Sequence, residues 1–448
     1  MEGMRQRFWH HLSWRIACAR VNESATTQAY RCDRYPLRVA LVITVWILAA
    51  LSLAGGAYWA VVRYRVERDG RNRPGLAEGE SLTLPAWPSV SVIIPAHNEE
   101  EHAPDLLRTL DSQDYPGELE IIFVLDRCTD ATRSALERER ARSAASGLRL
   151  PTLTIIDNHS CPEDWAGKCN AARLGAAAGK GEILLFTDAD THFAPSLVRC
   201  AVALAKTRSL ALLSALPEVS VRHAFEAAVQ PVAAVQLMKL YPISRVNAED
   251  EPRPFANGQF MLFTRESYDA LGGHAAVKDD LLEDLAFARR MVHVLKRRAG
   301  LFVADGLLGV RMYESFAQFR EGWRRILIEA CHRNPSRMSR YAVENATVGA
   351  VIPLIALATL VAAACALQAN DTPLAIGGFT AGAIALLLQL TTAARIYSLM
   401  GIPKRWAPTY PFGAIIVARI LWKGSRDLRE RRAVRWGGRQ YILAPRAD

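Results

Sequence analysis

The sequence predicts an α/β fold with a largely parallel, doubly wound sheet, flanked by transmembrane helices. Three observations lead to this prediction. Short β-branched runs alternate with charged helical stretches between residues 89 and 190, a pattern typical of parallel sheets covered by helices. Three apolar runs outside this region are each long enough to cross roughly 30 Å of hydrocarbon as a helix. The 448-residue chain is 50% hydrophobic and carries a net charge of +10, which excludes a disordered chain and suits an anionic lipid surface or a phosphate-bearing ligand.

The first apolar run covers residues 37–62 and predicts a transmembrane helix. It follows a basic N-terminal segment at residues 1–36, and it is too long and too deep in the chain for a cleaved signal peptide, which is the alternative interpretation. Residues 63–84 are polar, charged and glycine-containing, which predicts a linker. Because arginines lie on both sides of this helix, charge does not orient it.

Residues 85–330 are expected to form the α/β domain, since helical patterns separate its strand-like runs. Ligands of such a sheet bind at the carboxyl ends of its strands. The predicted strands are residues 89–96, 118–126, 153–157 and 181–190.

Two apolar runs at residues 346–367 and 373–394 predict a helical hairpin, joined by a turn without basic residues. Basic residues flank the hairpin on its outer sides, which predicts a cytoplasmic location for the region before residue 340. Residues 407–422 are shorter and contain prolines, so an interfacial or re-entrant helix is expected. The basic tail at residues 423–448 is expected to contact lipid headgroups.

The eight cysteines stand far apart, without a CxxC pair or a histidine cluster at zinc spacing. This pattern predicts reduced thiols and a cytosolic soluble portion. No stripe of interleaved basic and aromatic residues supports binding of nucleic acid.

Acidic residues follow the predicted strands at the points where a ligand is expected. Asp126 ends the second strand, and Asp188 and Asp190 end a later one. Alternate residues of an extended segment face the same side, so Asp188 and Asp190 can both offer oxygen to one Mg²⁺ or Mn²⁺ ion on a diphosphate. Taken alone, these residues also suit a structural turn at a strand end.

The other candidates have structural alternatives as well. Glu283 and Asp284 suit the start of a helix, where the dipole favours acids. Lys168 suits a solvated helix start, and Asn98 suits a helix cap.

The order of these features resembles one known family. The matching segments are SVIIPAHNEE, VLDRCTD, WAGKCNAARLGA before LFTDAD, FANGQFMLFTRESYDALGG and LLEDLAFARRM. From Ser89 to about Arg325 the chain resembles the membrane-bound family 2 glycosyltransferases with the GT-A fold, the mixed doubly wound sheet of nucleotide-diphospho-sugar transferases. The strongest resemblance is to bacterial hopanoid-associated, carotenoid-acid and ceramide glycosyltransferases.

This resemblance implies an inverting, metal-dependent transfer of a sugar from a nucleotide-diphosphate sugar to a lipid acceptor. It implies Mg²⁺ or Mn²⁺ as cofactor, a UDP-sugar rather than a GDP-sugar as the favoured donor, and a multi-pass protein of the inner membrane whose catalytic domain is cytoplasmic.

The resemblance also implies roles for single residues. Asp284 is expected to be the general base, supported by Glu283, and Asp188 and Asp190 are expected to hold the metal. The sugar and the acceptor are expected to meet at Gly258, Gln259 and Trp323. The nucleotide pocket is expected to contain Pro95, Ala96, Asn98, Glu99, Asp126, Lys168 and Asp188.

One motif departs from the family. Processive and ceramide-type relatives carry a Q/RxxRW box, whereas this chain has FAQFREGWRR, with Gly322 in place of the arginine before Trp323. Arg320, Arg324 and Arg325 are candidates to replace that arginine, and Trp323 also suits a membrane-interface anchor.

This departure argues against a processive polysaccharide synthase, one alternative function. A catalytically inactive nucleotide-sugar-binding membrane scaffold is another alternative, although every expected acid is present. Nucleotidyl transfer is disfavoured because the glycine-rich loop that it requires after the first strand is absent.

Overall fold

A computed structural model describes residues 25–71, 73–145, 147, 150–278, 280, 282–436 and 439–446. Most of the predicted basic N-terminal segment, residues 1–24, lies outside the described residues. The chain consists of two compact units. One comprises residues 1–61 and 351–390, and the other comprises residues 62–350 and 391–448. Each is described by itself.

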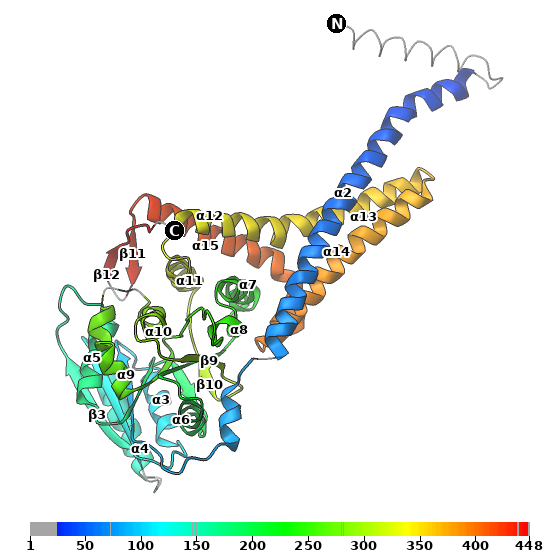
Figure 1. Cartoon of the computed structure of the whole chain (residues 1–448). Coiled ribbons are helices and arrows are strands. Elements are labelled where there is room, and N and C mark those ends of the chain that lie inside the picture. Colours follow the sequence, from blue (N-terminus) through cyan, green and yellow to red (C-terminus); the bar gives the residue numbers. More distant parts are fainter. Residues whose placement is uncertain are drawn as a thin grey trace. The chain divides into compact units, whose positions relative to one another are not determined.

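The larger unit is built on a seven-stranded sheet with the strand order β3-β2-β1-β4-β8-β6-β9 (Figure 1). Strands β1 to β4 run parallel to one another, whereas β8 is antiparallel to both of its neighbours, β4 and β6. The mixed sheet confirms the predicted fold class. The strands are β1 Val90–Ala96, β2 Leu119–Asp126, β3 Thr152–Asn158, β4 Ile183–Thr187, β6 Leu212–Leu216, β8 Phe260–Thr264 and β9 Ala299–Val303.

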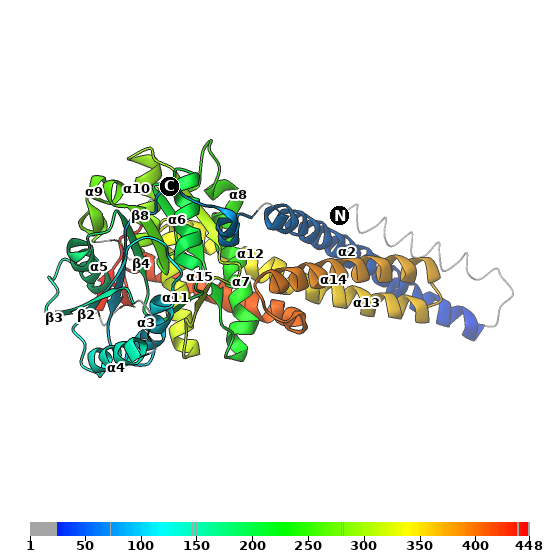
Figure 2. The same cartoon turned by 90° about the horizontal axis from the view of Figure 1, so that it is seen from below.

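Helices cover both faces of this sheet, because successive side chains of the buried strands point to opposite sides. Val92 and Ile94 pack in one core cluster with residues of α3 and α6, whereas Ile93 packs in another with residues of α5 and α10. Figure 2 shows these layers from a second side. The helices are α3 Ala103–Asp111, α4 Thr132–Ala145, α5 Gly167–Ala178, α6 Leu197–Thr207, α9 Arg265–Ala270 and α10 Glu283–His293.

Shorter elements complete the larger unit. A three-stranded sheet has the order β5-β10-β7, and a hairpin of β11 and β12 lies near the C-terminus. These strands are β5 Thr191–Phe193, β7 Glu218–Val219, β10 Leu308–Val310, β11 Ala433–Trp436 and β12 Arg439–Ile442. The remaining helices are η1 Leu76–Ser81, α7 Ala224–Leu240, α8 Ile243–Val246, η2 Gly273–Val277, α11 Phe316–Ala330, α12 Pro335–Glu344, η3 Asn345–Val351, η4 Lys404–Thr409 and α15 Tyr410–Arg429.

Three helices of the described residues are long and apolar enough to cross a membrane: Leu37–Arg71, Pro335–Gln368 and Thr372–Leu399. The three predicted apolar runs lie within them. The first helix is part of α2 Ala25–Arg71, the second contains α13 Ile352–Gln368, and the third is α14 Thr372–Leu399. In the smaller unit, small residues bring these helices together: a Cβ on Gly378 would lie 2.8 Å from the Ala363 side chain.

Two predicted segments differ from the structure in their detail. The predicted linker at residues 63–84 is largely helical, since α2 continues to Arg71 and η1 packs its fully buried Leu76 into the core. The predicted interfacial helix at 407–422 begins at Tyr410 and continues to Arg429. It extends into the predicted basic tail because one of its faces is buried as far as Leu428.

Candidate active site

The carboxyl ends of β1, β2 and β3 place Asp126 beside Asn158, its partner in the ladder. Asp126 is buried, at 4% exposure. Its Oδ2 pairs with the Arg127 guanidinium at 2.6 Å, and its Oδ1 accepts a hydrogen bond from the Asn158 amide at 2.8 Å. We call Asp126, Arg127 and Asn158 the Asp126 edge. Both carboxylate oxygens of this edge are therefore already bonded within the protein.

The loop after β1 follows Pro95 and Ala96, which pair with β2 in the sheet. Asn98 has a φ of 58°, and its side-chain oxygen accepts a hydrogen bond from the Thr129 amide at 2.8 Å. The helix-cap interpretation of Asn98 is wrong, because α3 begins at Ala103 and the Asn98 side chain instead joins this loop to the loop after β2.

Lys168 joins two of the acidic motifs. Its ammonium group lies 2.8 Å from Asp188 Oδ1 and 2.8 Å from Glu283 Oε1. Burial lowers the pKa of Lys168, but Asp188 and Glu283 outweigh burial and raise it overall. Lys168 is therefore a partly buried, ion-paired cation at the start of α5 rather than a solvated helix start.

Asp284 lies in the first turn of α10, as a helix N-terminus favours. Its Oδ2 accepts a hydrogen bond from the Gly258 amide at 2.8 Å. Burial, and then the charge of Glu283, raise the pKa of Asp284 to about 6. Burial also raises the pKa of Glu283, but Lys168 lowers it more, so the net shift is downward. Two adjacent carboxylates thus differ in proton affinity, an arrangement that suits an acid–base pair.

Gly258 occupies the centre of this arrangement. A Cβ there would lie 3.2 Å from Lys168 Nζ, 3.3 Å from Asp284 Oδ2 and 3.4 Å from Glu283 Oε1. The NGQF segment and the ED pair are therefore neighbours in space. The next residue, Gln259, is buried, and its carbonyl accepts a hydrogen bond from the Thr187 hydroxyl at the end of β4.

Asp188 and Asp190 follow β4, and Glu99 lies close enough to interact with both electrostatically. Burial, and then the charges of Asp188 and Glu99, raise the pKa of Asp190 well above its ordinary value. Asp190 Oδ1 is buried and has no hydrogen-bond partner among the described residues. Such crowded carboxylates fit a divalent cation, which takes oxygen ligands and offsets their charge. We call Glu99, Asp188, Asp190, Glu283 and Asp284, together with Lys168, the acidic cluster.

Trp323 is buried at 4% exposure, and its indole N–H donates to Gln230 on α7 at 3.1 Å. The membrane-interface interpretation of Trp323 is therefore wrong. Beside it, a Cβ on Gly322 would lie 2.8 Å from the ring of Tyr313. Tyr313 thus fills the space next to Gly322, which explains why no long side chain is accommodated there.

The three arginines proposed to replace the missing one lie in different surroundings. Arg320 stacks over Phe316 at 5.3 Å, and Arg324 forms a buried ion pair with Asp427 at 3.0 Å. Arg325 interacts electrostatically with Tyr313, and Tyr313 also interacts electrostatically with Asp190. Of the three, Arg325 is the one that shares a neighbour with the acidic cluster.

Sequence reasoning missed Asn158 and a group formed by Glu101, His102 and Glu314. Asn158 ends β3 level with Asp126, so the rule that ligands bind at carboxyl strand ends was the available signal. Glu101, His102 and Glu314 bring ligand atoms within 4.8 Å of one another. No sequence signal joins Glu314 to the other two, because more than 200 residues separate them.

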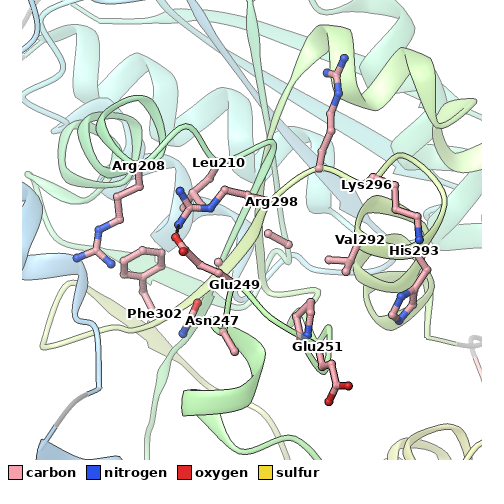
Figure 3. A pocket seen from close by; sticks show the side chains of 15 residues that line it. Arg208, Leu210, Asn247, Glu249, Glu251, Val292, His293, Lys296, Arg298 and Phe302 are labelled. Atoms are coloured by element: carbon pink, nitrogen blue, oxygen red, sulfur yellow. Dashed lines mark ion pairs between the residues drawn. The ribbon is translucent and has the colours of Figure 1, made fainter.

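A cavity of about 700 Å³ lies elsewhere, at the amino end of β9. Figure 3 shows its lining, in which Arg298 and Glu249 form an ion pair of 3.2 Å and Lys296 lies next to His293. None of the acidic-cluster residues lines this cavity. The candidate site is therefore the acidic cluster.

The family model for "Glycosyl transferase family 21" matches residues 44–445. The chain belongs to glycosyl transferase family 21. It is a glycosyltransferase, as the sequence resemblance to family 2 enzymes implied; the matching model carries a different family number but describes the same class of enzyme.

Among curated proteins, the family 21 chain is 28% identical over 286 residues to a 4,4'-diaponeurosporenoate glycosyltransferase of Staphylococcus haemolyticus, a match that covers 61% of this chain and 67% of that protein. It is 27% identical over 242 residues to the enzyme of the same name from Staphylococcus aureus. That match covers 52% of this chain and 60% of the relative, so the chain spans less than two thirds of the Staphylococcus aureus protein.

Among solved structures, a Pyrobaculum calidifontis mannosyltransferase in complex with GDP-mannose and Mn²⁺ is 20% identical, with a TM-score of 0.46 over 83% of this chain and 99% of that one. Glucosyl-3-phosphoglycerate synthase from Mycobacterium tuberculosis, in complex with Mn²⁺, UDP and glucosyl-3-phosphoglycerate, is 20% identical. Its TM-score is 0.33 over 57% of this chain and 83% of that one.

Proposed function

We propose that this glycosyltransferase moves a sugar from a nucleotide-diphosphate sugar to a hydroxyl group of a lipid, with inversion at the anomeric carbon. The observation that carries the proposal is the placement of Asp284: the Gly258 amide holds it close to Lys168, which in turn pairs with Asp188. A carboxylate with a pKa of about 6 is largely ionised at neutral pH and still accepts a proton readily.

In the proposed reaction, Asp284 takes the proton from the acceptor hydroxyl while the acceptor oxygen bonds to the anomeric carbon. The bond from that carbon to the diphosphate breaks on the opposite face, and the electron pair leaves with the nucleoside diphosphate. Glu283 stays ionised beside Lys168, so it discourages ionisation of Asp284 and keeps its proton affinity high.

Asp188 and Asp190 would hold Mg²⁺ or Mn²⁺. The donor set fits, because a buried oxygen of Asp190 has no partner in the described part of the chain and three carboxylates interact there. When bound, the ion would stabilise the negative charge of the departing diphosphate. The other residues proposed for the nucleotide are Pro95, Ala96, Asn98, Glu99, Asp126 and Lys168, and a UDP-sugar is the favoured donor.

A lipid acceptor is proposed because three helices are apolar and long enough to span a membrane and because curated relatives are named for 4,4'-diaponeurosporenoate. The cytoplasmic inner-membrane location is proposed from the basic residues on the outer flanks of the 346–394 hairpin and their absence from its turn. Gly258, Gln259 and Trp323 are proposed for the region where sugar and acceptor meet. Because Trp323 is buried against Gln230, its role would be to support the α11 segment.

The test is nucleotide release by the purified full chain in a lipid extract with Mg²⁺ or Mn²⁺, using a panel of UDP- and GDP-sugars. Asp284→Asn and Asp190→Asn are compared with Glu137→Gln, a matched carboxylate-to-amide change on the exposed face of α4. We expect release from one donor that both site variants lose and the control keeps. Mass spectrometry of the lipids then identifies the acceptor. Metal-dependent donor binding without turnover in the wild type would instead support a scaffold.

A further inference from the structure

A groove of about 550 Å³ lies between α12 and α15, within the larger unit. Its lining combines apolar side chains with bases, and none of the acidic-cluster residues contributes to it. The residues that matter for its chemistry are Val343, Ile415, Arg419, Trp422, Lys423 and Arg426.

The apolar part of the groove is unusually exposed. Val343 is 56% exposed, Ile415 is 45% exposed and Trp422 is 55% exposed. These side chains come from two helices but share one groove, so they form a continuous apolar surface rather than scattered single residues. A surface of this kind is stabilised by contact with hydrocarbon.

The basic part follows the same face of α15. Arg419, Lys423 and Arg426 are exposed and spaced at intervals of four and three residues, so they project from one side of the helix. Arg432 adds a fourth base to the lining. The acid that lines the groove, Asp427, is buried and already pairs with Arg324 at 3.0 Å.

Nearby acids neutralise only some of these bases. Lys423 lies 3.4 Å from Glu321, and Arg426 and Arg432 share Glu430, at 2.7 Å and 2.5 Å respectively. Within the described part of the chain, no hydrogen bond or ion pair involves the Arg419 guanidinium. The groove therefore offers positive charge beside an apolar surface.

We propose that this groove binds an anionic phospholipid, with the phosphate at Arg419 and Lys423 and an acyl chain along Ile415, Trp422 and Val343. Charge complementarity and the mixed lining support this occupant, since bases extend their charged ends toward headgroups while their stems cover apolar surface. The helix that includes α12, Pro335–Gln368, is also one of those long and apolar enough to cross a membrane. This site is separate from the proposed transfer site, and its lipid is not the sugar acceptor.

Native mass spectrometry of the full chain in non-ionic detergent tests the proposal. Phosphatidylglycerol and phosphatidylcholine with identical acyl chains are added separately, and the retained lipid is counted. We expect the wild type to retain more phosphatidylglycerol than phosphatidylcholine. The Arg419→Ala/Lys423→Ala variant should retain roughly tenfold less phosphatidylglycerol than the wild type. The matched control is Arg138→Ala/Arg142→Ala, which removes the same charge from the exposed face of α4.

Equal retention of phosphatidylglycerol by the wild type and the groove variant would overturn the proposal, as would a wild type without preference between the two lipids. An independent measurement locates the lipid. Phosphatidylglycerol with brominated acyl chains should quench the tryptophan fluorescence of the wild type more than that of Trp422→Phe. Quenching of the same size in both proteins would place the lipid elsewhere and overturn the proposal.

Discussion

The Asp126 edge and the acidic cluster lie at the same sheet but differ in how far protein groups balance the charges of their carboxylates. In the Asp126 edge, one carboxylate faces one guanidinium and one amide, and both of its oxygens are bonded. In the acidic cluster, five carboxylates accompany a single lysine, which pairs with two of them, Asp188 and Glu283. Within the described residues, the buried Asp190 Oδ1 has no hydrogen-bond partner. A charge that the protein balances itself is held in place before any ligand binds, whereas charge left unbalanced in a fold indicates a site that a ligand completes.

The largest effect is expected on turnover, when Asp284, the proposed base of the acidic cluster, is substituted. Asp284→Asn removes the proton acceptor but keeps the shape of the side chain, so we expect turnover to fall by about 10² to 10⁴-fold. Nucleotide release measures this change, and donor binding should stay within about threefold of wild type because a general base acts mainly in the transition state. A loss of turnover below tenfold would remove Asp284 from its proposed role.

The next effect concerns the one cation of the cluster. Lys168→Met leaves Asp188 and Glu283 without their partner, and we expect the free energy of unfolding to fall by about 2 kcal/mol at pH 8. Lys168 lowers the folded-state pKa of Glu283 below its ordinary value of 4.5. The stabilisation from this pair is therefore present above pH 4.5 and is lost as the pH falls through the folded-state pKa.

Denaturant unfolding at a series of pH values measures this change. The difference between wild type and Lys168→Met should shrink as the pH falls below about 4.5, and Lys168→Arg should retain part of the stability. A difference independent of pH would mean that Lys168 stabilises by packing rather than by charge.

The pH dependence of turnover also distinguishes the acidic cluster from the Asp126 edge. Of the two regions, the acidic cluster contains the proposed proton acceptor, Asp284, whose pKa is raised to about 6. A base is active when ionised, so turnover should rise with pH through a midpoint near 6. At pH 5 about a tenth of Asp284 would be ionised, which predicts a rate roughly tenfold below that at pH 8. Single-turnover nucleotide release checks this profile, and a flat profile between pH 5 and 8 would contradict it.

The sequence predicted the parallel part of this fold because its strands read as near-continuous apolar runs with helices between them. It also identified Asp188, Lys168 and Glu283. The fold brings Lys168 into contact with Asp188 and, across more than 100 residues, with Glu283. What it did not predict follows from long-range packing. The burial of Trp323 against α7 has no local signal, since an amphipathic tryptophan also suits a membrane interface.

The same reason explains the missed Asn98 geometry and the helical linker. A cap for the following helix is a local pattern, but Asn98 bonds to Thr129 on a different loop. Residues 76–81 are polar and glycine-containing, yet Leu76 anchors them in a core formed by distant strands. Local composition does not report such a contact.

The smallest expected effect compares the two regions directly, through the same substitution in each. Asp126→Asn weakens two charge-assisted bonds within the Asp126 edge, so we expect the free energy of unfolding to fall by about 1 to 2 kcal/mol. Burial, Asp188 and Glu99 disfavour the ionised form of Asp190, so in the absence of metal Asp190→Asn should raise the free energy of unfolding.

Unfolding at pH 8 in the presence of a chelator measures both variants, because an elevated carboxyl pKa destabilises the fold increasingly as the pH rises from its unfolded-state value. With Mn²⁺ added, the wild type should become more stable than Asp190→Asn, because the wild type gains more stability by binding the ion. Mn²⁺ should not reverse the order of stability between the wild type and Asp126→Asn. If both substitutions lowered the free energy of unfolding without metal, the protein itself would balance the charges of the acidic cluster, as it does at the Asp126 edge. The crowding of the carboxylates would then give no indication of a bound cation.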